Sequence, residues 1–222
     1  MGTELSQATI AHDSVVLVHG LWMHGWVMRL MGMRLKRCGF HPVFFSYPSM
    51  RSSLSQNALL LSRFTAAVAA SRIHFIGHSL GGLLVLQMLA EFSEQRTGRV
   101  ILMGSPYNVS NVATKLSRRG PGRYILGRSM LQWLDQKPLR HHARYELGVI
   151  AGRMSIGGGR LISRLPFPND GVVTVDETRV PHISDQIVLN VNHSGMLLSA
   201  GLALQACSFL RSGHFLHNPE SL

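Results

Sequence analysis

The residues best placed to do chemistry lie in the stretch 72–85, which reads RIHFIGHSLGGLLV. A short apolar run ends at GHSLGG (residues 77–82) and gives way to an apolar helical run. A G-x-S-x-G pattern between a strand and a helix places a serine hydroxyl on a sharp, strained turn. Alone, the pattern also fits a turn with a capping serine. Its setting favours Ser79 as a nucleophile, with the backbone N–H of Leu80 free to donate to a developing oxyanion.

A nucleophilic serine needs a base to take its proton, and His193 fits that role. It follows the apolar run QIVLNV (186–191), so it lies on a loop at the carboxyl end of the expected last strand, where sites of open α/β sheets gather. The chain has 12 histidines, and the rivals are His141, His142 and His182. His141 and His142 precede any suitable strand, and His182 enters a strand from its other end. The alternative role for His193 is a polar helix cap.

The base in turn needs an acid to fix its tautomer. Asp170, in PNDGVVTVDE, follows the strand expected near residues 146–151 and is our preferred candidate. Its competitors are Asp176, Glu177 and Asp185. Asp176 fits a solvated or capping carboxylate, and Asp185 lies just before the final strand.

The second oxyanion donor is expected after the first strand. His19-Gly20-Leu21 follows the apolar run SVVLV (14–18), which makes the amide of Leu21 the partner of the Leu80 amide. Trp22 and Met23 would then flank an acyl pocket, and His19 is expected to be structural.

These positions require an open, mostly parallel α/β sheet with helices on both faces. Short apolar runs alternate with helical patterns along the chain. We expect strands at 14–18, 42–47, 73–76, 99–103, 146–151 and 186–191. Helices are expected at 25–38, at 55–70, directly after the GHSLGG stretch, and at 194–210. In the first of these, Trp26, Leu30, Met33 and Arg37 follow helical spacing.

Length and composition predict one domain over residues 1–222. Two stretches interrupt the alternation of strands and helices. Residues 105–144 carry eight cations against Asp135 alone, a net charge of +7, with GPG at 120–122 as a hinge-like break. This basic segment is either a mobile cap over the site or an ordinary crossover with an extra helix. Residues 155–168, with three glycines and two prolines, are expected to form a flexible excursion.

The formal net charge is +11, and a face as basic as residues 105–144 can attract anionic lipid head groups, acidic substrates or nucleic acid, although a solvated surface that serves only solubility is the preferred explanation. No nucleic-acid motif is present, so no nucleic-acid partner is expected, while an anionic membrane surface remains a hypothesis. The oligomeric state is left open.

Cys38 and Cys207 are far apart and have no neighbouring C-x-x-C motif, so they are predicted to be two buried thiols, with no disulfide and no zinc site. The first residues carry no basic group ahead of an apolar core, and no run is long enough to span a bilayer. A cytoplasmic protein is therefore predicted.

Four stretches together, VLVHGLWMHGW, GHSLGG, NDGVV and NHSGMLLS, resemble the α/β-hydrolase superfamily and, within it, small bacterial lipases and esterases. The resemblance spans residues 14–210 and is weakest between 105 and 168. It implies that Ser79, Asp170 and His193 form the catalytic triad and that Leu21 and Leu80 form the oxyanion hole, with no metal or cofactor.

The sequence thus predicts a serine esterase that acts on a small-molecule acyl ester through an acyl-enzyme. Apolar residues near the site, Trp22, Met23, Met196 and Leu197, fit a hydrocarbon-like substrate but pack cores equally well. Thioesterase, amidase and acyltransferase activities use the same machinery. A non-catalytic basic binding module is the alternative from another class.

Overall fold

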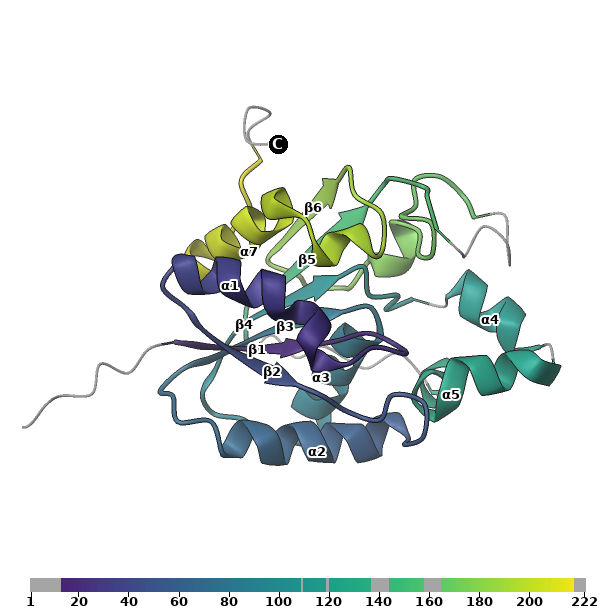
Figure 1. The fold of residues 1–222 in the computed structure, drawn as a ribbon, viewed down its shortest axis with the longest axis horizontal. Coiled ribbons are helices and arrows are strands. Elements are labelled where there is room, and N and C mark those ends of the chain that lie inside the picture. Colours follow the sequence, from purple (N-terminus) through teal and green to yellow (C-terminus); the bar gives the residue numbers. More distant parts are fainter. Residues whose placement is uncertain (1–12, 109, 119, 137–143, 158–164, 218–222) are drawn as a thin grey trace, which may run out of the picture.

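The computed structural model describes residues 13–108, 110–118, 120–136, 144–157 and 165–217. Its centre is one six-stranded sheet with the order β2-β1-β3-β4-β5-β6, in which all neighbouring strands run parallel (Figure 1). The predicted α/β class is confirmed. The strands are β1 (Ser14–Val18), β2 (His41–Phe45), β3 (Ile73–His78), β4 (Thr97–Met103), β5 (Leu147–Gly152) and β6 (Asp185–Leu189).

Helices cover both faces of the sheet, as expected. Figure 1 shows α1 and α7 together on one face and α2 and α3 on the other, while α4 and α5 pack on each other beyond the sheet, next to α2. The helices are α1 (Arg29–Arg37), α2 (Leu54–Ala66), α3 (Leu80–Glu91), α4 (Asn111–Ser117), α5 (Gly120–Asp135) and α7 (Ala200–Ser212), with short 3-10 turns η1 (Gly25–Met28), η2 (Asp176–Thr178) and η3 (Gly195–Leu197).

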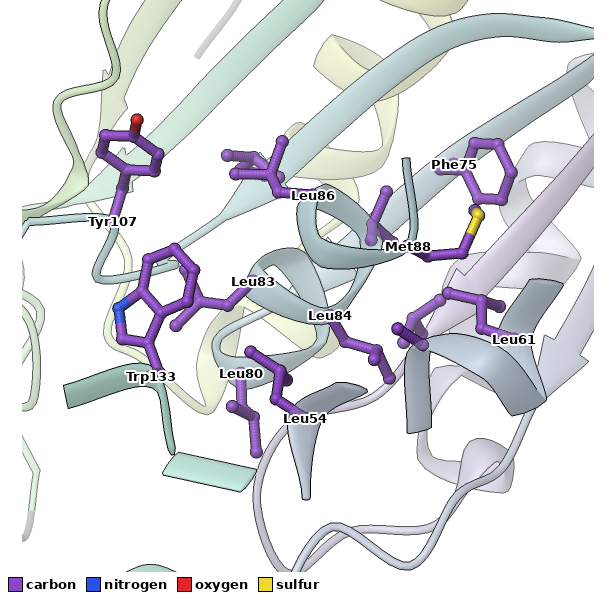
Figure 2. Packing of buried hydrophobic residues seen from close by; sticks show 14 of the residues in the cluster. Leu54, Leu61, Phe75, Leu80, Leu83, Leu84, Leu86, Met88, Tyr107 and Trp133 are labelled. Carbon is purple, nitrogen blue, oxygen red and sulfur yellow. The ribbon is translucent and has the colours of Figure 1, made fainter. Parts of the chain in front are cut away.

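Alternate residues of β1 belong to two different apolar clusters, because successive side chains of a strand point to opposite faces of the sheet. Val16 and Val18 belong to the cluster under α2 and α3, whereas Val15 and Leu17 belong to the one under α1 and α7. Helix α3 is buried along most of its length, and Figure 2 shows its leucines packed among side chains of α2, β3 and α5. Burial of each such leucine stabilises the fold by about 1.5–3 kcal/mol. The helix that begins beside Ser79 is therefore firmly held.

Two predicted helices differ in detail from the observed ones. In the 25–38 stretch the buried side chains are Met28, Met31 and Leu35, while Trp26 and Met33 of the predicted pattern are exposed. The expected 194–210 helix is divided into η3 and α7, because Ser199 caps the N-terminus of α7 by accepting a hydrogen bond from the Leu202 N–H. The loop after β6 is thus longer than the sequence pattern indicated.

The prediction of two free thiols was wrong. Cys38, at the end of α1, and Cys207, in α7, form a disulfide between residues 169 positions apart, with 6.3 Å between their Cα atoms. The two helices meet on the same face of the sheet, a contact that the spacing of the cysteines does not reveal. Disulfides persist in oxidising compartments, so this bond weighs against the cytoplasmic prediction, which stays untested.

The basic segment forms two helices in its described part. The GPG triplet opens α5 rather than breaking a helix, and α5 bends at Gly127, whose φ is 65°. Residues 137–143 and most of the glycine-rich stretch, 158–164, lie outside the described residues, as do His141 and His142.

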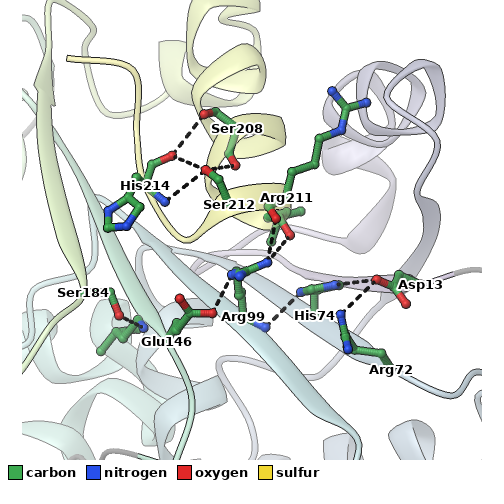
Figure 3. Close-up of polar contacts among 12 residues, drawn as sticks. Asp13, Arg72, His74, Arg99, Glu146, Ser184, Ser208, Arg211, Ser212 and His214 are labelled. Carbon is green, nitrogen blue, oxygen red and sulfur yellow. Dashed lines mark hydrogen bonds and ion pairs between the residues drawn. The ribbon is translucent and has the colours of Figure 1, made fainter.

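A polar network closes the amino ends of the central strands (Figure 3). His74 of β3 lies between Asp13, which its Nε2 contacts at 3.3 Å, and the backbone N–H of Arg99, which donates to its Nδ1 at 2.9 Å. Arg99 in turn pairs with Glu146 at 2.7 Å and donates to the carbonyl oxygens of Leu210 and Arg211. The network ties β3, β4 and α7 together.

None of the described helices has the length and apolarity to cross a membrane.

Candidate active site

Ser79 lies at the turn between β3 and α3 in a backbone conformation that non-glycine residues rarely adopt, with φ 53° and ψ −123°. Its N–H donates to the carbonyl oxygen of Met103, which fixes the turn against β4. A side chain at Gly77 would meet the backbone of Gly82 at 2.3 Å, and one at Gly81 would meet the Val18 carbonyl oxygen at 2.3 Å. The glycines are therefore required by the close packing that holds the hydroxyl at the edge of the sheet.

Asp170 and His193 meet at the same edge. His193 Nδ1 lies 2.7 Å from Asp170 Oδ2, and the backbone N–H of His193 also donates to the Asp170 carbonyl oxygen at 2.9 Å. The other carboxylate oxygen, Oδ1, accepts from the N–H groups of Val172 and Val173 at 2.9 and 2.7 Å. Because Asp170 is buried and fully bonded, it holds His193 with the proton on Nδ1, which leaves Nε2 as an acceptor.

Two contacts place this pair beside Ser79. The ring of His78, the residue before the serine, lies 4.8 Å from the His193 ring, and its Nε2 donates to the His193 carbonyl oxygen at 3.0 Å. A Cβ placed on Gly104, which follows the residue that bonds Ser79 N–H, would lie 3.2 Å from His193 Nδ1 and 3.1 Å from Asp170 Oδ2. The three residues that the sequence singled out thus gather at one place.

The contacts among the described residues include no hydrogen bond from Ser79 Oγ to the imidazole. In enzyme structures without ligand, catalytic hydrogen bonds are often long and shorten when substrate binds. Proton transfer here requires Oγ and His193 Nε2 to come within hydrogen-bonding reach in the substrate complex.

The loop after β1 supplies the second side of the site. A Cβ on Gly20 would lie 3.2 Å from Ser79 Cβ, so the 19–22 loop packs directly on the serine. The N–H of Trp22 donates to Ser49 Oγ at 3.3 Å, so it is not available to donate to an oxyanion at Ser79. Leu80 is the first residue of α3, so its N–H has no partner within the helix. The amides of Leu21 and Leu80 remain the candidate oxyanion donors.

A comparison with family models agrees with this geometry. Residues 15–217 match the model described as the alpha/beta hydrolase family. The chain belongs to the alpha/beta hydrolase family. The predicted resemblance is therefore confirmed at the level of the family.

Solved structures of other hydrolases share the fold. The mature lipase BlEst2 of Bacillus licheniformis is 19% identical, with 91% of this chain and 92% of that chain covered and a TM-score of 0.70. The metagenomic carboxyl esterase MGS0156 is 19% identical over 83% of this chain and 65% of that one, with a TM-score of 0.64. The esterase EaEST of Exiguobacterium antarcticum is 12% identical over 91% and 93%, with a TM-score of 0.66. No curated protein matches the chain.

The competing carboxylates of this hydrolase have other partners. Asp185 accepts from the Phe215 N–H and contacts His217, and Asp176 pairs with Arg179. Glu177 is buried and accepts from the N–H groups of Asn111 and Thr174, so it joins α4 to the loop after Asp170. Their contacts are structural, and the geometry singles out Asp170.

The two predicted pocket residues lie differently. The side chain of Trp22 is largely exposed and its indole N–H donates to the Ile125 carbonyl oxygen. Met23 is half-buried against the core under α1 and α7. Met196 and Leu197 are buried in that same core. For these methionines and Leu197 the structure favours core packing.

His78 and Asn169 were not predicted to belong to the site. Burial lowers the pKa of His78 to about 3, so it stays neutral and can donate to the loop of His193. Asn169 Oδ1 accepts from the Gly171 N–H and the Ser155 hydroxyl, which shapes the turn around Asp170. The sequence held a signal for both, since each directly precedes a predicted catalytic residue.

His19 is buried, as expected of a structural residue. Its Nδ1 donates to the Gly20 carbonyl oxygen and its Nε2 accepts from the Tyr47 N–H. Burial lowers its pKa, so it supports the loop at residues 19–22 as a neutral ring. Within the described ranges no three His, Cys, Asp or Glu side chains are grouped so as to hold a metal ion.

Proposed function

We propose that this alpha/beta hydrolase cleaves carboxylic esters through a Ser79–His193–Asp170 triad and an acyl-enzyme intermediate. The observation that carries the proposal is the buried 2.7 Å contact between Asp170 and His193, set beside a serine on a strained strand-to-helix turn. General-base activation needs a histidine whose Nδ1 is held by a carboxylate and whose Nε2 can accept the proton of a neighbouring serine.

In the proposed reaction His193 Nε2 takes the Ser79 proton as Oγ bonds to the acyl carbon. The negative charge that develops on the carbonyl oxygen is stabilised by the N–H groups of Leu21 and Leu80. Collapse of the tetrahedral intermediate breaks the ester C–O bond, and the proton on His193 passes to the leaving alcohol. Water then gives a proton to His193 Nε2 as its oxygen bonds to the acyl carbon. Collapse of the second tetrahedral intermediate breaks the bond to Ser79 Oγ, which takes the proton back from His193 as the acid leaves.

The lipase and esterase structures named above make an ester the first substrate to test, and at 12–19% identity their likeness shows the fold alone. Thioester hydrolysis or acyl transfer would use the same groups. A panel of aryl esters of graded acyl length, run beside matching thioesters, separates these activities and reports the depth of the acyl pocket. Faster turnover of thioesters across the panel would favour the thioesterase alternative.

A fluorophosphonate probe separates an enzyme from a binding module. We expect the folded wild type to be labelled and Ser79→Ala to remain unlabelled. Asp13→Asn, a change at the opposite end of the sheet, serves as the matched control and should be labelled like wild type. Folded wild-type protein that resists the probe would contradict the proposal.

A further inference from the structure

Large apolar side chains are exposed on and beside the 19–22 loop, which carries the proposed oxyanion donor Leu21. The exposed fractions are 63% for Trp22, 85% for Tyr124 and 40% for Ile125. The indole N–H of Trp22 donates to the Ile125 carbonyl oxygen at 2.9 Å, so the loop after β1 and helix α5 touch at this point. Contiguous exposed apolar side chains, unlike single scattered ones, are typical of interaction surfaces.

Cations lie on the same helix and on a turn that packs against it. Arg123 and Arg128 lie on α5 and Arg51 on the turn before α2, and all three are exposed. The Arg128 N–H donates to the Met50 carbonyl oxygen at 3.0 Å, which brings that turn against α5. None of the three arginines forms an ion pair within the part of the chain that the structure describes. Their charges are thus available to an outside partner.

Acidic side chains are absent from the described part of this surface. Between residues 105 and 136 the sequence has a single carboxylate, Asp135, at the far end of α5. Glu177, which reaches α4, is buried and satisfied by two backbone N–H groups. The surface is positive as well as apolar, and this combination selects its partner.

The surface is continuous with the candidate active site. Trp22 follows Leu21, one of the proposed oxyanion donors, and the same loop packs against Ser79 through Gly20. A partner that covers Trp22 is therefore in contact with the loop that borders the reacting centre.

We propose that this aromatic-basic surface binds an anionic lipid surface and sets the active site against it. The aromatic-basic surface consists of Trp22, Arg51, Arg123, Tyr124, Ile125 and Arg128. Exposed Trp and Tyr side chains settle at the headgroup level of a bilayer, and nearby Arg side chains attract anionic headgroups. Nucleic acid satisfies the charges but offers less to Ile125 and to a surface of this apolar character. The inference rests on the proposed function, because it assigns that site an acyl substrate drawn from an interface.

The test measures co-sedimentation with vesicles of phosphatidylcholine alone or mixed with phosphatidylglycerol. Ser79→Ala protein is used, so that binding is scored without turnover. The test variant adds Arg123→Glu and Arg128→Glu. The matched control adds Arg37→Glu and Arg63→Glu, exposed positions on α1 and α2 that change the net charge equally. Thermal unfolding confirms that each protein folds, and the single change Arg123→Gln replaces the double variant if it does not.

We expect binding to the mixed vesicles only, weakened by salt. Each basic residue removed is expected to weaken partitioning about fivefold, so the test variant should bind more than about tenfold less well than the control. Hydrolysis of a soluble aryl ester by the corresponding Ser79-containing variants should be unchanged. Failure of that hydrolysis in wild type would overturn the proposed function, whereas vesicle binding decides the surface separately.

Three outcomes would overturn the inference. The first is binding that does not depend on phosphatidylglycerol or salt, and the second is an equal loss in the test and control variants, which would reduce the effect to net charge. The third is a random-sequence DNA duplex that binds as tightly as the mixed vesicles and loses binding through the same two substitutions.

Discussion

The sheet carries a histidine–aspartate pair at each end, and the two pairs differ in what they leave free. At the carboxyl edge, Asp170 engages His193 Nδ1 at 2.7 Å and Nε2 remains an acceptor. At the amino edge, the His74 ring is engaged on both sides, by Asp13 at Nε2 and by the Arg99 N–H at Nδ1. An imidazole with both nitrogens engaged has no position from which to take a proton.

The difference extends to the nearest hydroxyls. His74 of the amino-edge pair and Thr97 both line a cavity of about 290 Å³, but the Thr97 hydroxyl donates to the Glu94 carbonyl oxygen, and Thr97 begins strand β4. Ser79 occupies a strained turn beside the N-terminus of α3. A histidine, a carboxylate and a hydroxyl in proximity thus make a site only where the backbone and the free nitrogen permit one.

The largest expected effect comes from removing the two hydroxyls in turn. Ser79→Ala should lower kcat for an aryl ester by about 10⁴-fold or more, since the covalent route is lost. Thr97→Val should stay within about twofold of wild type, because its hydroxyl bonds only a carbonyl. Steady-state kinetics measure both. Equal losses in the two variants would remove the distinction between the two ends.

The two carboxylates come next. Asp170→Asn should lower kcat by about 10³–10⁴-fold, because an amide no longer fixes the proton on His193 Nδ1. Asp13→Asn should change kcat by less than about twofold while it weakens the contact with His74. The comparison requires circular dichroism to establish that both variants fold. If activity falls similarly in Asp13→Asn, the amino-edge pair takes part in catalysis and the account is wrong.

The disulfide should affect stability and spare catalysis. Cys38 and Cys207 join α1 to α7, and α7 also receives the amino-edge Arg99 through the Leu210 carbonyl oxygen. Cys38→Ser with Cys207→Ser should lower the free energy of unfolding by about 2–5 kcal/mol, with kcat/KM near wild type. Urea denaturation of both proteins measures this, and an unchanged denaturation midpoint would contradict it.

Stability should also fall as the pH drops below about 6.5. Burial lowers the pKa of His19, His74 and His78 in the folded state, so below the ordinary pKa the unfolded chain binds more protons than the folded one. The loss is at most about 1.4 kcal/mol per pH unit for each histidine, and above about pH 7 the contribution is constant. Urea denaturation at about pH 7.5 and about pH 5 measures the difference in unfolding free energy.

Replacing His74 tests whether the pH dependence of stability comes from a buried histidine. His74→Gln should have a shallower slope below about pH 6.5 and a lower stability at about pH 7.5, by about 1–3 kcal/mol, because the Arg99 N–H loses its partner. The control His41→Gln lies at an exposed position. Identical slopes in wild type and His74→Gln would refute the assignment.

The positions that sequence reasoning found share a short-range signal. The turn at Ser79 depends on glycines within four residues, and the parallel direction of the strands places the carboxyl ends of β3 and β6 at the same edge of the sheet. The disulfide escaped prediction because Cys38 and Cys207 pair only through the packing of α1 on α7. The buried face of α1 was misjudged because Trp26 lies in the exposed part of η1, where the helical period does not hold. The sequence did not predict the aromatic-basic surface, because Trp22 lies near Tyr124 and Ile125 only through the packing of α5 against the loop after β1.

The central claim is that Ser79 becomes acylated during turnover. Rapid quenching of the reaction with an aryl ester, followed by mass spectrometry of the digested protein, measures this directly. The account predicts a burst of the aryl alcohol and a mass increase equal to the acyl group on the peptide that contains Ser79. Turnover with no acyl group on that peptide, or with the acyl group on another residue, would contradict it.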